Sequence, residues 1–348
     1  LITSSAASDV YKRQIEIMCS FQINKLAENT KKVFIEEICQ TPGGSPINLT
    51  ILVVKGKNLG PTLVVSGGVH GDEYEGPLTI MNLYKELSEK EIKGCFVGLV
   101  VANVPAFESA TRCSPIDGLN LARIFPGKVN GSVTEKIAYW IGETLIKKTD
   151  YYIDLHSSGS DMEMPQMCGY ITKDNSQKAS FSKEMAEVFN AKVTWAHNNS
   201  GKGRTLSFAS DHDVPAIYTE CPASRSVASE DVAAYLRGVK NVMTLINMIR
   251  GNYEGQKSKI RLKGDGDTDA SIKAMNSGFF IARVKLLENV KENKLLGEIL
   301  DLTGDIVESV YAPKDGVIGL RRLLPTVKSG DNLFLLACLL YTSDAADD

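Results

Sequence analysis

The sequence predicts an α/β fold with a mostly parallel mixed sheet flanked by helices, and a small C-terminal all-β domain. Up to about residue 250, short apolar runs alternate with amphipathic helical segments, which is typical of a parallel sheet covered on both faces. From residue 274 only short strand-like runs follow, separated by turn residues, and this pattern favours a β-sandwich.

The predicted elements of the first part follow one another in the order that such a sheet requires. Predicted strands cover residues 33–38, 47–54, 62–69, 96–102, 151–155, 193–196 and 216–219. Predicted helices cover residues 75–87, 132–148, 179–189 and 229–250. Ser132 and Glu135 form an S-x-x-E capping pattern at the start of the second helix.

The sequence beyond residue 250 has a different pattern. Residues 251–269 are rich in Gly, Asp and Lys, and predict a connector or an exposed hairpin. The predicted strands beyond it cover residues 279–284, 296–302, 306–311, 316–320 and 332–336. Residues 1–14 and 338–348 resemble translated adapter sequence, so they are expected to be non-native and are excluded from fold reasoning. The expected domains are therefore 15–250, the α/β domain that carries the candidate site residues described below, and 251–337, the β-sandwich.

Composition excludes several classes of function. The chain of 348 residues has 43% apolar and 23% charged residues, as ordinary globular proteins do. A net charge of −3 gives no basis for binding nucleic acid or an anionic membrane surface. No apolar run approaches the roughly 18 residues of a membrane span. Seven cysteines without a C-x-x-C pair favour reduced thiols and a cytoplasmic location.

The most informative stretch is 62–75, TLVVSGGVHGDEYE. An apolar strand stops at glycines and delivers His70, Asp72 and Glu73 to its C-terminal end, where ligands bind in an open α/β sheet. Imidazole nitrogen and carboxylate oxygen both suit a divalent metal, above all zinc. The alternative is a loop histidine with satisfied hydrogen bonds beside solvated acids.

Two further strand ends carry the same kind of residue. His156 follows the strand 151–155 and is the candidate third ligand, whereas Asp154 alternates to the other side of that strand and is expected to be structural. Glu220 ends the strand 216–219, where a carboxylate with a raised pKa could act as general acid and base. The alternative for Glu220 is a capping or surface group. His197 and His212 are expected at surface or supporting positions.

The segment 103–127 has few helix or strand signals and carries Arg112 and Arg123. Arginine binds a carboxylate through two parallel hydrogen bonds, so a loop of this kind beside a metal site favours an anionic substrate. The alternative is a pair of surface arginines on a coil.

Five segments, in this order, resemble the succinylglutamate desuccinylase/aspartoacylase family, which is similar in fold to the zinc carboxypeptidases: G-G-V-H-G-D-E, R-x-x-P-x-D-G, R-x-F-P-G, D-L-H-S and T-E-C-P. The resemblance runs from about residue 23 to 337. It implies one Zn²⁺ per chain, held by His70, Glu73 and His156. It also implies Glu220 as the general acid/base, and Arg112 and Arg123 facing a substrate carboxylate or the polarised carbonyl.

One departure from the family pattern concerns the substrate. Family members often carry an asparagine directly before the arginine of R-x-F-P-G, but here Ala122 precedes Arg123 and Asn120 lies two residues earlier. Asn120 is kept as a candidate substrate-binding residue. The departure leaves the substrate's identity open more than the reaction type.

Together these features predict a zinc-dependent hydrolase of a small N-acylated amino acid, or a related carboxylate-bearing amide or ester. A metal-activated water would attack the carbonyl while Glu220 accepts and returns the proton. The alternatives are a carboxypeptidase-like enzyme, an esterase, or a non-catalytic metal- or ligand-binding homologue. The expected partner is a small-molecule substrate, with homo-oligomers possible.

Overall fold

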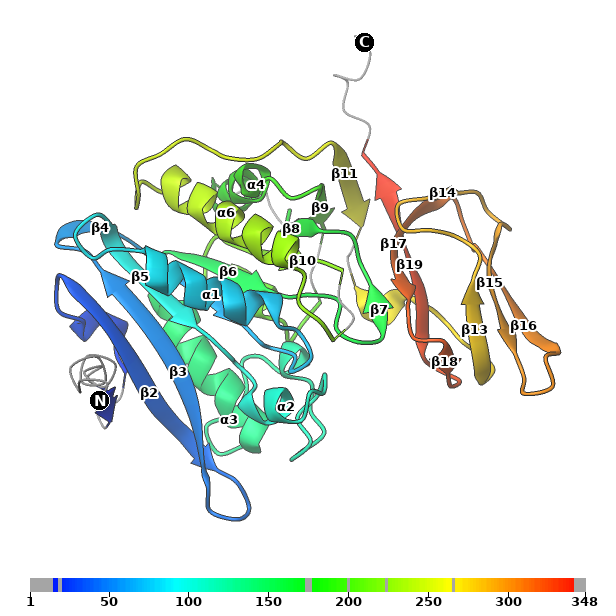
Figure 1. Cartoon of the computed structure of the whole chain (residues 1–348), viewed down its shortest axis with the longest axis horizontal. Coiled ribbons are helices and arrows are strands. Elements are labelled where there is room, and N and C mark those ends of the chain that lie inside the picture. Colours follow the sequence, from blue (N-terminus) through cyan, green and yellow to red (C-terminus); the bar gives the residue numbers. More distant parts are fainter. Residues whose placement is uncertain are drawn as a thin grey trace, which may run out of the picture.

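The computed structural model describes residues 15–17, 21–172, 177–198, 201–222, 225–264 and 267–340, and it confirms the predicted fold class (Figure 1). Residues 1–14, predicted to be adapter-derived, lie outside the described residues, as do 341–348 of the second such segment. Within the described ranges, no helix is both long and apolar enough to cross a membrane.

A long mixed sheet forms the centre of the molecule. Its main strands lie side by side in the order β1 (Ile15–Ile17), β2 (Thr30–Gln40), β3 (Pro46–Lys55), β5 (Lys93–Leu99), β4 (Asn58–Gly67), β6 (Tyr151–Leu155), β10 (Ala216–Glu220), β8 (Met167–Ile171), β9 (Val193–His197) and β11 (Ile260–Gly264). The pairs β5–β4, β4–β6, β6–β10, β8–β9 and β9–β11 are parallel. The strand β3 runs antiparallel to β2 and β5, and β8 runs antiparallel to β10, so the sheet is mixed but mostly parallel.

Helices cover both faces of this sheet, because its central strands are apolar on both sides. The helices α1 (Glu75–Glu86), α4 (Gln177–Phe189) and α6 (Ser229–Leu245) pack on one face. The other face is covered by α3 (Val133–Trp140) and α5 (Thr205–Asp211). Leu63, Val64 and Val65 of β4 are fully buried between the two layers, as the apolar run predicted.

The predicted helix over 132–148 begins as expected but changes its winding. The capping box is present, with the Ser132 amide donating to Glu135 Oε2 over 2.9 Å. The α-helical part ends at Trp140, and a π turn (Ile141–Leu145) and a 3-10 turn (Ile146–Lys148) complete the segment. The predicted helix over 229–250 ends earlier, at Leu245.

Several short elements were not predicted. They are β8, β7 (Met162–Glu163), α5 and α2 (Val104–Glu108), the last inside the segment expected to lack regular structure. In β8 the run M-C-G-Y-I carries a glycine, which weakens the strand signal. The structure gives the reason for Gly169: a Cβ there would lie 2.1 Å from Cε1 of Tyr218, whose ring crosses β8 at this point.

The prediction for residues 251–269 was wrong in one respect. Residues Ile260–Gly264 form β11, which pairs with β9 and, antiparallel, with β19 (Asn332–Leu339). The strand was missed because it is short and lies within a stretch rich in Gly, Asp and Lys, although the alternation of apolar and polar residues in I-R-L-K is typical of a half-buried strand. The strand order continues from β19 to β17 (Gly316–Arg322) and β14 (Asn289–Val290).

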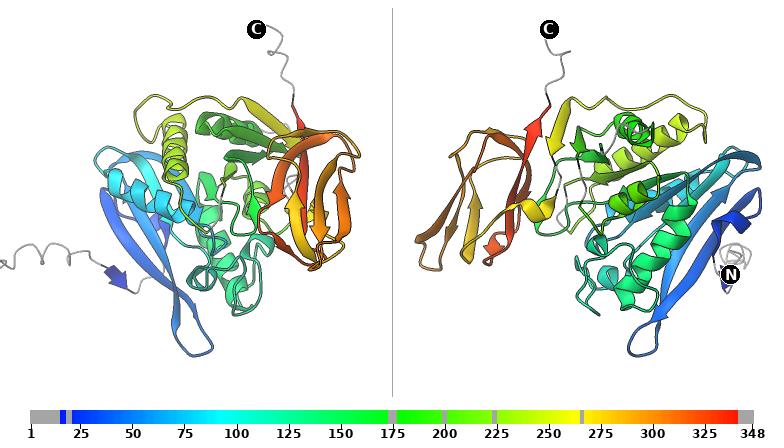
Figure 2. Two further views of the ribbon diagram at one scale, coloured as in Figure 1. Left: turned by 45° about the vertical axis from the view of Figure 1, so that its right-hand side comes forward. Right: turned by 180° about the vertical axis from the view of Figure 1, so that it is seen from behind.

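The C-terminal unit is a β-sandwich, as predicted. A second sheet, β16 (Ile306–Tyr311), β15 (Leu295–Leu300), β13 (Gly278–Ala282) and β18 (Thr326–Val327), packs on β17 and β19. Phe280, Ile299 and Phe334 lie at the centre of this core. The unit lies at one end of the molecule (Figure 2). The central sheet runs on into it through β11 and β19, so the domain boundary at residue 250 stays a prediction. Cys338 and Leu339 belong to β19, and the adapter origin of 338–348 also stays a prediction.

Candidate active site

Three adjacent parallel strands end at one edge of the sheet. β4, β6 and β10 are neighbours, and Gly67, Leu155 and Thr219 lie level with one another in the ladder. His156 comes directly after β6, Glu220 is the last residue of β10, and His70 follows β4 after a short turn. The sequence-based expectation that these strand ends meet is thus confirmed.

Three of the predicted residues converge on one point. The Glu73 carboxylate lies between the two imidazoles, with Oε1 2.7 Å from His70 Nδ1 and Oε2 2.9 Å from His156 Nδ1. One donor atom from each of the three residues lies within 4.8 Å of the other two, and all three residues are buried. Among the described residues this is the cluster of His, Cys, Asp and Glu that could hold a metal ion.

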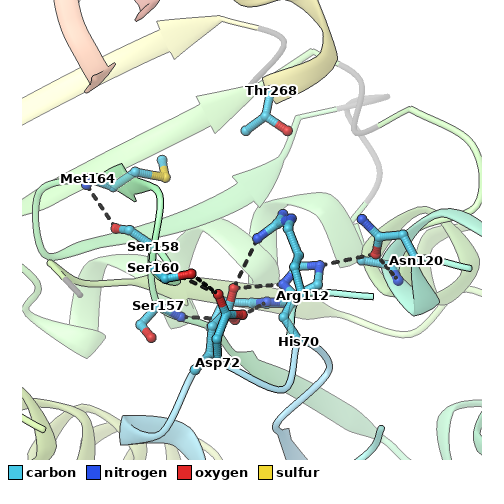
Figure 3. A network of polar contacts seen from close by, with 12 residues as sticks. His70, Asp72, Arg112, Asn120, Ser157, Ser158, Ser160, Met164 and Thr268 are labelled. Atoms are coloured by element: carbon cyan, nitrogen blue, oxygen red, sulfur yellow. Dashed lines mark hydrogen bonds and ion pairs between the residues drawn. The ribbon is translucent and has the colours of Figure 1, made fainter. Parts of the chain in front are cut away.

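The turn that carries His70 and Glu73 depends on glycine. A Cβ at Gly71 would lie 2.0 Å from the carbonyl carbon of Ala106, because the turn passes directly over α2. The Gly71 amide also donates to the Thr111 carbonyl over 2.9 Å. The neighbouring Asp72 serves a different purpose, since its Oδ2 accepts from the amide (3.0 Å) and hydroxyl (2.8 Å) of Ser160 (Figure 3). Asp72 therefore anchors the loop after β6.

A second layer of acceptors fixes each imidazole. His156 Nε2 lies 3.1 Å from Oδ2 of Asp154, a fully buried carboxylate that also accepts from the hydroxyls of Ser66 (2.7 Å) and Thr205 (2.5 Å). Asp154 is therefore a supporting residue, as expected, but the expected reason was wrong: residues two positions apart point to the same side of a strand, so Asp154 faces His156 and does not point away from it. His70 Nε2 lies 3.1 Å from Oδ1 of Asn120, the displaced asparagine.

These contacts decide which nitrogen can bind a metal. An acceptor at Nε2 keeps the proton there, so Nδ1 of both rings presents its lone pair toward Glu73. Two imidazole nitrogens and one carboxylate form a donor set that zinc binds in catalytic sites with an open position. The residues present therefore fit a single Zn²⁺.

The buried charges perturb one another strongly. Burial alone would raise the pKa of Glu73, but the imidazoles of His70 and His156 hold it well below its usual range. Burial lowers the pKa of His70 to about 4, and nearby Arg112 acts in the same direction. The pKa of His156 lies well above its ordinary value, because the Asp154 and Glu73 carboxylates outweigh the effect of burial.

Glu220 lies in the same cavity as the two histidines. The cavity has a volume of about 80 Å³, and its wall includes His70, His156 and Glu220. Burial, and next the charge of Glu73, raise the pKa of Glu220 to about 8. Its Oε2 is buried and has no hydrogen-bond partner among the described residues. This carboxyl group is therefore free to exchange a proton with a molecule in the cavity.

Both predicted arginines also line the cavity. Arg112 is 43% exposed, and its Nη1 lies 3.3 Å from Oε1 of Glu73. Arg123 is less exposed and already binds Asp269, with 3.0 Å between Nε and Oδ2. Ala122 lies in the wall as well, so a methyl group stands where the family pattern has an amide.

The wall residues that sequence reasoning did not assign to the site include His197, Arg204 and Tyr218. His197 was expected at a surface or supporting position, but it is 2% exposed, and its Nε2 lies 2.8 Å from the Tyr218 hydroxyl. Burial lowers the pKa of His197 to about 4. Its position at the end of β9 was the signal that could have found it. His212 is exposed, as expected.

A wider outer pocket of about 360 Å³ has Arg112, Asn120, Arg123 and Glu220 in common with the site. One wall comes from the loop after β6, including residues 157–161. The opposite wall comes from the C-terminal part of the chain: Thr268, Asp269, Leu320, Arg322, Asp331 and Asn332. Thr268 faces the site from the far side in Figure 3. The C-terminal unit thus shapes the mouth of the cavity.

Comparisons with known proteins agree with this geometry. The profile of the succinylglutamate desuccinylase/aspartoacylase catalytic domain matches residues 59–246, which include the candidate ligands and Glu220. A curated relative, the N-alpha-acetyl-L-2,4-diaminobutyric acid deacetylase of Halomonas elongata, is 27% identical over 294 residues, covering 84% of this chain and 86% of the relative.

Solved structures share the fold over nearly the whole chain. The product-bound ectoine utilization protein EutE (DoeB) of Ruegeria pomeroyi is 24% identical with a TM-score of 0.82, covering 90% of this chain and 98% of that one. A succinylglutamate desuccinylase/aspartoacylase of Rhodobacter sphaeroides is 23% identical with a TM-score of 0.83, covering 94% and 99%.

Proposed function

Because this chain belongs to the succinylglutamate desuccinylase/aspartoacylase family, we propose that it is a zinc-dependent deacylase that hydrolyses the amide bond of a small N-acylated amino acid. The observation that carries the proposal is the convergence of His70, Glu73 and His156 beside Glu220 in one small cavity. The name of the Halomonas relative supports an acylated amino acid as the substrate class.

In this proposal His70, Glu73 and His156 hold one zinc ion. When bound, the ion supplies Lewis acidity, which lowers the pKa of water and polarises a carbonyl oxygen. Asp154 and Asn120 keep the proton of each imidazole on Nε2, so that both Nδ1 atoms stay available as ligands.

Glu220 is the proposed general base and general acid of the reaction. Its carboxylate accepts a proton from the attacking water and then donates it to the amide nitrogen of the leaving amine. The pKa of about 8 supports this role, since a group that titrates near neutral pH can both hold and release a proton. The unpartnered Oε2 supports it too, because no other described group competes for that atom.

Arg112 is proposed to bind the substrate carboxylate. It is the most exposed arginine of the cavity wall, and its ion-pair partner is Glu73, which the metal would engage. Arg123 and Asn120 remain proposed substrate-facing residues of the outer pocket. A cytoplasmic location and homo-oligomer formation stay predictions from the sequence.

The test is hydrolysis of a panel of N-acyl amino acids, short peptides and esters by the zinc-loaded protein. We expect acyl amino acids to be preferred, and Glu220→Gln to lower kcat by about 10²–10⁴-fold with zinc content unchanged. Glu143→Gln, which removes a surface carboxylate paired with Lys147, is the matched control. Preference for peptides or esters, or a Glu220→Gln variant with undiminished turnover, would contradict the proposal.

A further inference from the structure

Two arginines of the cavity wall are already bound to carboxylates of the chain itself. Arg123 grips Asp269 with both ends of its guanidinium: Nε lies 3.0 Å from Oδ2, and Nη2 lies 3.4 Å from Oδ1. Its Nη2 also donates to the Thr268 hydroxyl over 2.9 Å. Arg204 Nη2 binds Asp267 and lies 3.8 Å from Oδ2 of Asp269.

This arrangement changes the charge that the cavity offers to a substrate. Arg123 and Arg204 are only 22% and 18% exposed, so their charges are met mainly by these two carboxylates. Burial would raise the pKa of Asp269, but the hydrogen bond and charge of Arg123, and next the charge of Arg204, hold it below its usual range. Among the described residues, the acidic partner of Arg112 is Glu73. Of the three guanidinium groups in this inner wall, only Arg112 is paired with a candidate metal ligand, whereas the other two are paired with acids outside the metal site.

We propose that Asp267 and Asp269 are specificity-determining residues that restrict the enzyme to N-acyl amino acids with a single carboxylate. The inference rests on the proposed function and narrows its substrate class. Arg112 accepts the one carboxylate. A second carboxylate, either on the acyl group or on the amino-acid side chain, would have to approach Asp269 or displace it from Arg123. Two carboxylates close to one another repel, so such a substrate binds less well. A neutral or cationic side chain meets no such obstacle.

A purely structural role would also explain these ion pairs, because they join the segment leading into the C-terminal unit to the catalytic domain. The chain offers a matched control for that role. Arg321 on β17 and Glu163 on β7 form another ion pair between the same two parts, with Nε 2.6 Å from Oε2. Neither residue lines either cavity. Breaking this pair loosens the same junction without changing the charge of the site.

The experiment compares N-acetyl-L-glutamine with N-acetyl-L-glutamate, which have nearly the same shape and differ by one charge. For wild type we expect kcat/KM to favour glutamine by about tenfold, a size expected for one partly screened charge contact. Asp269→Asn keeps the shape but frees Arg123, so the preference falls at least threefold through a lower KM for glutamate. Asp267→Asn, which frees Arg204, shifts the preference the same way, and Glu163→Gln leaves it unchanged.

A binding measurement separates this inference from the proposed function. Calorimetric Kd values for both ligands are measured with Glu220→Gln alone and combined with Asp269→Asn. A binding preference that Asp269→Asn reduces, without wild-type turnover of either ligand, upholds the charge selection and overturns the proposed hydrolysis. Turnover without the preference, a glutamate preference in wild type, or equal shifts in Asp269→Asn and Glu163→Gln overturn the charge selection. If neither ligand binds or reacts, both proposals are wrong.

Discussion

Replacing Asp154 by asparagine tests how the second layer of the site controls the first. The Asp154 carboxylate is fully buried and receives three donors: the hydroxyls of Ser66 and Thr205, and Nε2 of His156. An asparagine of the same shape offers one oxygen and one NH₂ group. The NH₂ group must then face either His156 Nε2, where two donors meet, or a hydroxyl that has to accept instead of donate, and a buried polar group left unsatisfied costs about 1–3 kcal/mol.

The consequence for the metal follows from the tautomer of His156. With an NH₂ group opposite Nε2, the ring proton moves to Nδ1, the atom that faces Glu73 and should bind the ion. Loss of such a supporting partner lowers metal affinity by about 10–100-fold. We therefore expect Asp154→Asn to weaken zinc binding by this factor, and to lower the free energy of unfolding of the metal-free protein by about 2 kcal/mol.

The assay is zinc competition against a chromophoric chelator at neutral pH, with urea unfolding of the metal-free form. Tyr152→Phe is the control, because the Tyr152 hydroxyl contacts Ser66 over 2.5 Å and also interacts with Asp154, so its removal disturbs the same cluster but keeps the carboxylate that faces His156 Nε2. That variant should bind zinc within about threefold of wild type, well below the effect expected for Asp154→Asn. If Asp154→Asn also binds zinc as tightly as wild type, Asp154 does not set the His156 tautomer and this reasoning is refuted.

Three further variants test His197 in the cavity wall, Gly71 in the turn that carries His70 and Glu73, and Arg112 as the proposed carboxylate-binding residue. Burial lowers the pKa of His197 to about 4 in the folded protein. As the pH falls, His197 is therefore protonated in the unfolded chain before it is protonated in the folded one. Between pH 6.5 and 4 the protein should lose about 3 kcal/mol of unfolding free energy through this group, and His197→Gln should show a shallower pH dependence in urea melts; equal slopes would contradict this. Gly71→Ala places a Cβ 2.0 Å from the Ala106 carbonyl carbon, so it should lower stability by about 2 kcal/mol and weaken zinc binding. Gly43→Ala, with no contact nearer than 3.9 Å, should change neither, and equal melting temperatures of the two variants would disprove the steric argument. Arg112→Gln should raise KM about tenfold or more for N-acyl amino acids but not for their carboxamide analogues, and an equal rise for both would remove Arg112 from carboxylate binding.

The centre of the site could be predicted from sequence because local signals define it. An apolar run of strand length followed by a histidine or glutamate marks the end of a strand, and parallel strands deliver such ends to one edge. His70, His156 and Glu220 satisfy this rule, and the structure brings all three to the same cavity. The capping box at Ser132 was equally local.

The rest of the cavity depends on which strands become neighbours, which no local pattern encodes. His197 reaches the site because β8 lies between β10 and β9 and its Gly169 lets the Tyr218 ring cross the strand. Asp269 reaches Arg123 from 146 positions along the chain. These contacts follow from tertiary packing, so neither composition nor periodicity could show them.

Asn120 illustrates the difference between position in the sequence and position in space. Its displacement from the family pattern leaves the substrate's identity open, and the sequence predicts Asn120 as a substrate-binding residue. In the structure its Oδ1 contacts His70 Nε2 over 3.1 Å and also caps the Ala122 amide over 2.9 Å. The Asn120 side chain thus supports a candidate metal ligand. The Ala122 methyl group lies in the cavity wall, where the family pattern has an asparagine side chain.

The measurement that tests the central claim most directly is a zinc titration of the metal-stripped protein, followed by calorimetry, for wild type and His156→Ala. Wild type should bind one zinc ion per chain. His156→Ala, which removes the ligand supplied by β6, should bind it at least about 100-fold more weakly, whereas His212→Ala should match wild type. Stoichiometric zinc binding of equal strength in wild type and His156→Ala, or none in wild type, would contradict a site assembled from the ends of β4 and β6.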